Sequence, residues 1–381
     1  MKSIASAPAK IILFGEHFVV HGTKAILAAI DKRVTVTTTI TEKNSLRINS
    51  QLGTFVVQYH SHRRTDDSLE YRRQQAEYPE RFTKSNSSML DGRQSIKNEF
   101  MPFVYLVAKL YDWTQTKFKL VEDRYPDGLE ITIDSDIPVG VGLGSSSACC
   151  VAAAASLCAL FRRLQGDGFD PTKHCNGEFN EDETWEILKL AKEAERTVFP
   201  QASGADCTVC TYGGMIEYTK DKFGNPGGDT KKIDNTFDLN LLIANSMIPH
   251  NTKNSVEKVN KFKESDGERF SQLCDLETKL IDEVIVAMKN NDAAAFGLKM
   301  SENQKYLEEI QVSNDTLRDM ISSLSEISLG SKITGAGDGG CVIALVKDEN
   351  MDKVPALLPK DKECFSAKID TKGVVRSTIE E

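Results

Sequence analysis

A glycine-rich stretch that runs into three serines is the part of the sequence whose residue types point most directly to chemistry. It reads, in order, Gly140, Val141, Gly142, Leu143, Gly144, Ser145, Ser146 and Ser147. Glycine has no Cβ, so a bulky anion can approach the main chain closely. The serines can cap a following helix, whose free N–H groups and positive end would then face the loop. The stretch therefore predicts a phosphate-binding loop.

The loop does not match the two best-known phosphate-binding patterns. No Lys-Ser or Lys-Thr pair ends it, as in a Walker A sequence, and Ser145 and Ser147 stand where the dinucleotide-binding pattern has its third glycine. The simpler alternative is a flexible turn with an ordinary serine cap.

Two carboxylates lie in helical patterns further along the chain. Glu195 shares a helix face with Leu188 and Ala191, which predicts that its carboxylate points inward. A buried acid needs a partner, and the alternatives are a structural ion pair and a metal ion. Asp206 lies in the first turn of the next predicted helix, with Ser203 as the expected cap, and its simpler role is that of a capping acid.

The elements that must position these residues follow from the hydrophobic pattern. Leu129–Ile133 is a predicted strand before the glycine loop, and the apolar run Ala148–Phe161 is a predicted buried helix after it. Strand, loop and helix in this order are the setting that a phosphate site needs. Other strands are expected at residues 10–14, 25–30, 34–40, 215–219, 239–244, 333 and 342–346. Other helices are expected at residues 100–111, 184–199, 256–262, 270–288, 293–310 and 316–327.

The chain is long enough for two domains, which we expect at residues 1–225 and 226–381. Residues 220–235 are rich in Gly, Asp, Asn and Lys and are typical of an interdomain link. Residues 60–98 are crowded with charged and polar side chains, which predicts a surface insertion.

Composition narrows the function classes. A formal net charge of −9 argues against a nucleic-acid-binding surface, so a phosphate ligand must be held by local donors. The nine cysteines lie mostly in apolar segments, as in an intracellular protein with reduced thiols. Cys207 and Cys210 have redox or metal spacing, but no second pair or nearby His completes a zinc site. The longest apolar run is too short for a membrane span. We expect a cytoplasmic protein without a signal peptide, with the peroxisome as the alternative compartment.

Two more motifs frame the glycine loop. The chain opens with Ser6-Ala-Pro-Ala-Lys-Ile-Ile-Leu-Phe-Gly-Glu-His17, with Val-Val-His-Gly at 19–22, and later contains Lys332-Ile-Thr-Gly-Ala-Gly-Asp-Gly-Gly-Cys341. In this order the three motifs resemble the kinase family named for galactokinase, homoserine kinase, mevalonate kinase and phosphomevalonate kinase, the GHMP kinases. The opening motif, the segment Pro249–Lys253 and the spacing from Glu195 to Asp206 make the resemblance closest to the mevalonate kinase branch.

The resemblance implies a two-domain fold of mixed α/β and α+β type. Its N-terminal domain would be ribosomal-protein-like with a βαβ unit, and its C-terminal domain would be ferredoxin-like. The implied activity is ATP-dependent phosphorylation of (R)-mevalonate. The alternatives are a sister kinase acting on phosphomevalonate or a sugar, and a catalytically inactive metabolite sensor.

The resemblance also implies roles for single residues. The loop from Gly140 to Ser147 would bind ATP, Ser146 and Glu195 would hold Mg²⁺, and Asp206 would be the catalytic base beside Lys10. The expected substrate-binding residues are Lys10, Glu16, His17, Asp206 and Thr252. Two residues depart from the family pattern: Ser147 replaces the usual alanine without expected consequence, and Asp338 replaces a glycine and is expected to repel a polyphosphate unless its side chain turns away. A homodimer and inhibition by a prenyl diphosphate are also implied.

Overall fold

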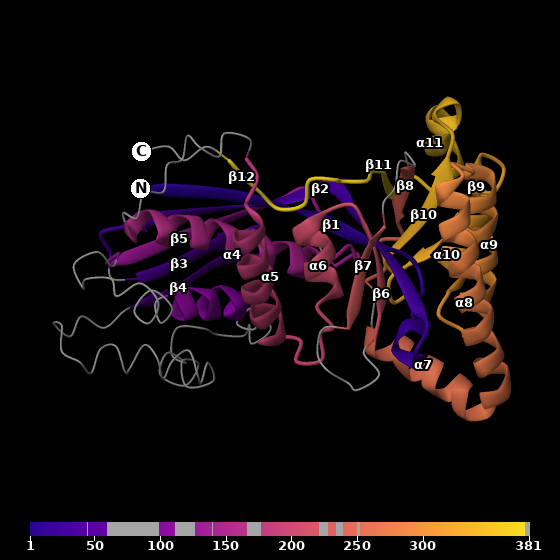
Figure 1. The fold of residues 1–381 in the computed structure, drawn as a ribbon. Helices are drawn as coiled ribbons and strands as arrows, with labels where there is room; N and C mark the ends of the chain where they lie inside the picture. Colours follow the sequence, from indigo (N-terminus) through magenta and orange to yellow (C-terminus); the bar gives the residue numbers. More distant parts are fainter. Residues whose placement is uncertain are drawn as a thin grey trace.

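The computed structural model describes residues 1–43, 45–58, 99–110, 126–138, 140–165, 177–220, 228–233, 239–249 and 252–377. Its strands form two sheets, one of eight strands and one of four, which belong to two neighbouring domains (Figure 1). The expected surface insertion at residues 60–98 lies outside the described residues. A two-domain fold of mixed α and β structure is therefore confirmed.

The first sheet is built around two long antiparallel strands, β1 (Lys2–Phe14) and β2 (Lys24–Thr41). The strand order is β12-β1-β2-β5-β3-β4, and β6 and β7 extend the sheet from the other end of β2. The remaining strands are β3 (Ser45–Ser50), β4 (Gly53–Gln58), β5 (Gly128–Ser135), β6 (Met215–Thr219), β7 (Asp229–Ile233) and β12 (Val375–Ser377). Residues 25–40, predicted as two strands, are parts of the single strand β2, and the pairing of β1 with β2 shifts register at the point where the break was expected.

Three helices pack around this sheet: α4 (Ser145–Gln165), α5 (Glu181–Arg196) and α6 (Ala205–Tyr212). Helix α4 contacts β1, β2 and the two other helices, and its Ala-rich sequence is buried on nearly every side. By length and composition alone α4 could cross a membrane, but most of it is buried inside the protein. The prediction of a buried core helix at residues 148–161 is confirmed. A helix was predicted at residues 100–111; residues 99–110 are helical, and residue 111 lies outside the described residues.

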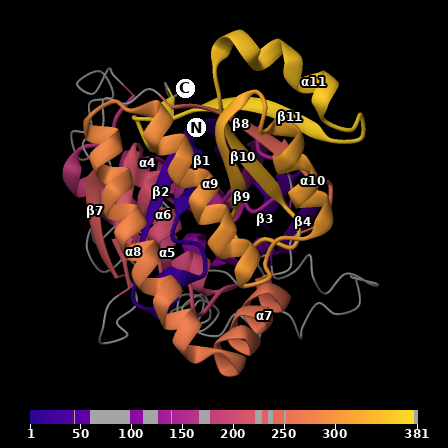
Figure 2. The ribbon, with the colours of Figure 1, turned by 90° about the vertical axis from the view of Figure 1, so that its right-hand side faces the viewer.

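The second domain is a four-stranded antiparallel sheet with the order β11-β8-β10-β9. Its strands are β8 (Asn240–Asn245), β9 (Ser328–Thr334), β10 (Cys341–Val346) and β11 (Glu363–Lys368). The long helices α8 (Gly267–Lys289) and α9 (Ala293–Glu309) run side by side, and α10 (Asp315–Leu324) lies against β9 and β10 (Figure 2). Helix α7 (Thr252–Ser265) and the short α11 (Val354–Leu357) complete the domain.

Strand pairing joins two strands that follow residue 225 to the first sheet. Strand β7 lies inside the segment expected to be a link, and it pairs with β6 of the first sheet. Strand β12 follows the second domain in sequence, yet it pairs with β1 (Figure 1). Neither strand was predicted, because β7 carries mostly exposed polar residues and β12 is only three residues long.

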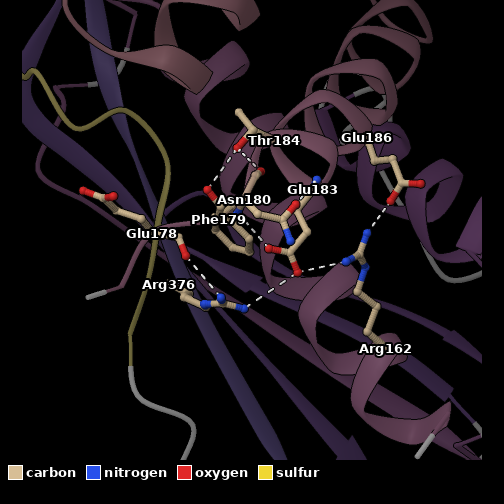
Figure 3. Close-up of polar contacts among 8 residues, drawn as sticks. All are labelled: Arg162, Glu178, Phe179, Asn180, Glu183, Thr184, Glu186 and Arg376. Carbon is tan, nitrogen blue, oxygen red and sulfur yellow. Dashed lines mark hydrogen bonds and ion pairs between the residues drawn. The ribbon is translucent and has the colours of Figure 1, made fainter. Parts of the chain in front are cut away.

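A buried carboxylate fastens β12 to the helices (Figure 3). Glu183 Oε1 accepts a hydrogen bond of 2.8 Å from Arg162 on α4 and lies 3.9 Å from a guanidinium nitrogen of Arg376 on β12. Glu183 Oε2 accepts a 3.0 Å hydrogen bond from the backbone of Asn180, whose side chain caps α5 in return. Glu183 thus joins the start of α5, the end of α4 and the returning strand.

We expect Glu183→Gln to destabilise the fold, because the amide keeps an oxygen for Asn180 but withdraws the charge that faces two arginines. The free energy of unfolding should fall by about 2 kcal/mol, as for lost hydrogen bonds to charged groups. Urea denaturation measures it. Glu186→Gln, which affects the more exposed contact of Arg162, is the control and should cost less than half as much. Equal losses in the two variants would show that Glu183 has no special part in fastening β12.

Candidate active site

The predicted site residues meet in a cavity of about 820 Å³ that both domains line. The lining residues that the sequence singled out are Lys10, Glu16, His17, Gly140, Gly142, Gly144, Ser145, Ser146, Ser147, Glu195, Asp206 and Thr252. Val141 and Leu143 do not belong to this lining, because their side chains are buried in the core of the first domain. Those two residues can offer only their backbone to a ligand.

The glycine loop follows β5, as the sequence predicted, but α4 begins at Ser145, so the three serines form the first turn of the helix and do not precede it. Gly140, Gly142 and Gly144 all have positive φ angles, of 76°, 80° and 73°, which favour glycine. At position 144 the absent side chain also matters for packing, since a Cβ there would lie 2.5 Å from Cγ of Lys10. The backbone N–H of Lys10 donates to the carbonyl of Leu143 at 3.0 Å. The loop is therefore fitted against β1.

Lys10 and Asp206 form an ion pair at the bottom of this loop, with Lys10 Nζ 3.0 Å from Asp206 Oδ2. Lys10 projects from β1 and is nearly buried, whereas Asp206 is about one third exposed and lies in the first turn of α6. The expectation that Ser203 caps this helix is wrong. Gly204 occupies the cap position in a left-handed conformation, and Ser203 Oγ instead accepts a hydrogen bond from the N–H of Ala205. The carboxylate of Asp206 faces Lys10.

Glu195 points inward from the last turn of α5, as predicted, and is buried. Ser147 Oγ donates a short hydrogen bond to Glu195 Oε1, and Cys207 Sγ donates to Oε2 at 3.4 Å. Burial raises the pKa of Glu195, the charge of Asp206 raises it further, and the donors Ser147 and Cys207 and the charge of Lys10 oppose the shift. Within the described part of the chain no salt bridge reaches this carboxylate, so the structural ion pair considered from the sequence is not found.

The expectation that Ser147 is a change without consequence is wrong. Of the three serines it is the buried one, and it binds Glu195, whereas Ser146 is exposed and lines the cavity. The helical geometry explains this: Ser147 is two residues into α4 and turns toward α5, while Ser146 faces the ligand space.

The oxygen donors that face the cavity fit a magnesium ion. Ser146 offers a hydroxyl, and Glu195 and Asp206 offer carboxylates that already repel one another. No group of three or more His, Cys, Asp and Glu side chains suited to a metal occurs among the described residues. Mg²⁺ needs no such group, because it is held by one or two protein oxygens together with phosphate and water.

Behind the cavity the two domains are joined by buried charges. Lys332 Nζ of β9 donates to Glu16 Oε1, which follows β1, and to the carbonyl of Ile333 at 2.7 Å. Burial raises the pKa of Glu16 and lowers that of Lys332, and the charge of each opposes the other's shift. The second oxygen of Glu16, Oε2, has no hydrogen-bond partner among the described residues, although Glu16 lines the cavity. That oxygen is a buried acceptor in need of a donor.

Glu277 of α8 extends this buried network. Its Oε1 accepts a 2.9 Å hydrogen bond from the N–H of Gly15, and its Oε2 accepts one of 2.7 Å from Asn303 of α9. Burial, and after it the charge of Glu16, raises the pKa of Glu277 to about 7. The sequence analysis missed Glu277, although it shares a helix face with the buried Leu273 and Leu280, which is the same pattern that revealed Glu195.

His17 and the last glycine loop close the opposite side of the cavity. His17 has a φ of 62°, and its Nε2 lies 2.8 Å from the carbonyl of Ala336, so a neutral ring donates there. Burial lowers the pKa of His17, which favours the neutral form. The two glycine loops also face each other, since a Cβ on Gly335 would lie 3.8 Å from the carbonyl of Gly142. Thr252, at the first residue of α7, is exposed toward the same space.

The chain is similar to known proteins over nearly its whole length. The model of the N terminal domain of GHMP kinases matches residues 106–214, and that of the GHMP kinases C terminal domain matches residues 284–356. The mevalonate kinase of Thermococcus sibiricus is 30% identical, over 94% of this chain and 93% of that protein. The mevalonate kinase of Arabidopsis thaliana is 28% identical, over 98% of this chain and 99% of that protein.

Solved structures show the same similarity. The mevalonate kinase of L. major, in complex with R-mevalonate, has a TM-score of 0.70 at 23% identity and covers 98% of this chain and 97% of its own. The mevalonate kinase of Methanococcus jannaschii has a TM-score of 0.69 at 25% identity, over 96% of this chain and 98% of its own.

The buried carboxyl of Glu277 should make stability depend on pH. Its pKa is about 7 in the folded protein and 4.5 in the reference state, so between these values the folded protein holds a proton that the unfolded chain releases. The stability contributed by this group is complete below about pH 4.5 and is lost as the pH rises through about 7. Glu277→Gln resembles the protonated acid, so we expect the unfolding free energy of the variant to lose this decline.

Urea denaturation at a series of pH values measures the slope. Glu268→Gln, which changes an exposed acid at the start of the same helix, should keep the slope of the unmodified protein. A variant Glu277→Gln with an unchanged slope would show that the pKa of Glu277 is not raised.

Proposed function

Because the chain belongs to the GHMP kinase family, we propose that it transfers the γ-phosphoryl group of ATP to the 5-hydroxyl of (R)-mevalonate, a step that supplies isoprenoid and sterol precursors. The family is shown by the near full-length similarity to relatives at up to 30% identity. The single observation that carries the chemistry is the ion pair of Lys10 and Asp206, which faces the glycine loop within one cavity. The pair brings a base and a cation to the place where a phosphate would lie.

Asp206 is the proposed base for the attacking alcohol. Its carboxylate takes the proton of the 5-hydroxyl, the freed oxygen bonds to the γ-phosphorus, and the bond from that phosphorus to the bridging oxygen of ADP breaks. Lys10 stabilises the negative charge that builds on the reacting oxygens, because its ammonium group is nearly buried and held 3.0 Å from Asp206. The backbone N–H groups of the loop at residues 140–147 bind the phosphates of ATP at the start of α4.

The rest of the substrate is assigned to residues on the far side of Lys10. Glu16 Oε2 is a buried acceptor with no partner among the described residues, which suits a hydroxyl of mevalonate. Thr252 offers a hydroxyl at the N-terminus of α7, where the helix dipole favours an anion such as the substrate carboxylate. His17 lines the same cavity and is held by the carbonyl of Ala336.

Magnesium is the proposed cofactor, with Ser146 and Glu195 as its protein ligands. When bound, the ion would offset the charge of the triphosphate. Ser147 and Cys207 hold the carboxylate of Glu195 in place, and burial together with the charge of Asp206 raises the pKa of Glu195 despite the nearby charge of Lys10.

Finer expectations about ligands and assembly stay proposals. The cavity wall includes apolar side chains of the first domain, such as Phe103, Ile137 and Val198. Such a wall supports the proposal that a prenyl diphosphate binds with its diphosphate on the glycine loop, in competition with ATP. A homodimer in the cytoplasm is proposed from the family resemblance alone.

A coupled assay of ADP release tests the proposed function. Mevalonate should be the best substrate in a panel with phosphomevalonate, galactose and homoserine, and preference for one of the others would favour a sister kinase. We expect Asp206→Asn to lower kcat by roughly 10²-fold or more, because the amide cannot accept the proton. Asp315→Asn is the control: Asp315 is also an acid in the first turn of a helix, α10, but it lies outside the cavity lining, so its loss of charge should leave kcat unchanged. Normal turnover in Asp206→Asn would remove the base from the mechanism.

The metal assignment is tested by comparing two neighbouring serines. Ser146→Ala should raise the magnesium concentration needed for half-maximal rate, since an exposed hydroxyl that faces the cavity is lost. Ser145→Ala should change the affinity for ATP without this magnesium dependence. Initial rates over a magnesium titration distinguish the two, and identical titration curves would rule out Ser146 as a ligand.

A further inference from the structure

Asp338, in the middle of the last glycine loop, holds a backbone conformation that suits glycine better than aspartate. Its φ is 55°, between Gly337 at 75° and Gly339 at 156°. Neighbouring backbone fixes the loop on both sides: the N–H of Asp338 donates to the carbonyl of Val312 at 2.8 Å, and a Cβ on Gly339 would lie 2.5 Å from the carbonyl of Ile248. A glycine at 338 would have the same path with less strain, so the contribution of Asp338 lies in its side chain.

The side chain of Asp338 points to α7. Its Oδ1 lies 2.7 Å from Lys258 Nζ, and its Oδ2 accepts a long hydrogen bond of 3.5 Å from Ser255 Oγ, one helical turn earlier. The carboxylate is mostly buried in this contact, and Asp338 does not line the cavity in the described part of the chain. The repulsion of polyphosphate considered from the sequence is therefore avoided, because the charge is turned away and paired.

Toward its C-terminus α7 packs on the second domain, where Val259 is buried and Phe262 meets Phe270 of α8 edge-on. Among its fourteen residues only Ser255 and Val259 are buried. Yet two of its exposed residues, Thr252 and Val256, line the cavity. The first turns of α7, which contribute to the binding site, lie away from this packing and need a contact that fixes their position.

We propose that Asp338 is a positioning residue, which through Lys258 and Ser255 fixes α7 on the last glycine loop and so sets the place of Thr252 at the cavity. This inference rests on the proposed function, in which Thr252 contacts the acid substrate. The glycine loop stays in place without Asp338, because His17 and backbone hydrogen bonds hold it from both sides. Loss of the contact with α7 therefore affects the acid substrate and not ATP.

Two variants remove the contact from opposite sides. In D338G the loop loses the carboxylate and the strained φ together, and in K258Q the helix loses the cation. Both should raise KM for mevalonate about 3- to 10-fold, as for the loss of one partly exposed ion pair, with kcat and KM for ATP within about 2-fold. The double variant should be no worse than either single one, because both disrupt the same contact. K261Q, which changes an exposed lysine on the same helix, is the control and should resemble the unmodified protein.

Stability separates positioning from a purely structural role. D338G should melt within about 2 °C of the unmodified protein or higher, because glycine relieves the left-handed conformation. A lower melting temperature together with unchanged KM would show that the contact only supports the fold. Unchanged KM in both D338G and K258Q overturns the proposal whatever the melting temperature.

Hydrogen exchange provides a readout that needs no substrate. Amides in the first two turns of α7 should exchange faster in D338G and K258Q than in K261Q, while those of β9 and β10 stay protected. Absence of mevalonate-dependent ADP release in the unmodified protein would contradict the proposed function, and exchange would still test the contact. Equal exchange in all variants would contradict the positioning role alone.

Discussion

The site depends on one nearly buried lysine side chain, that of Lys10, which lies against the backbone of the glycine loop. Lys10 leaves the long strand β1, runs over Gly144 where no side chain could fit, and ends on Asp206 at the start of α6. The strand, the loop and the helix are fixed by each other at this point, because the backbone of Lys10 also binds Leu143. A nearly buried ammonium group needs its carboxylate, so the position of α6 follows from that of β1. The packing of α4 on β1 then brings Glu195, through Ser147, to the same place.

A second set of buried polar contacts connects the end of β1 to the second domain. The end of β1 binds β9 twice through Thr334, whose hydroxyl donates to the carbonyl of Ile12 and accepts from its N–H. Lys332 and Glu277 then surround the turn after β1 at Gly15 and Glu16. Polar groups of this kind are costly to bury unless each finds its partner, so they favour one relative placement of the two domains over others.

The sequence was most informative where one short pattern determined the structure. The alternating glycines, the small apolar residues of α4 and the inward face of Glu195 are local signals, and the structure has each of them where it was expected. Contacts between distant segments were not accessible in this way. The pairing of β12 with β1 joins the two ends of the described chain, and β7 is too polar to be recognised as a strand. The predictions for Ser147 and Ser203 were wrong because a serine hydroxyl can form a hydrogen bond to a helix end, to a turn or to a neighbouring side chain, and the sequence does not show which.

The return of β12 has a consequence for how the protein is made. A ribosome releases the residues of β1 before those of the second domain and those of β12 after them, so the edge of β1 that pairs with β12 stays open while the second domain is synthesised. Until β12 is synthesised, Glu183 lacks its contact with Arg376. The unpaired edge of β1 can meanwhile form strand pairs with another chain. The sheet of the first domain is thus completed only after the second domain has been synthesised.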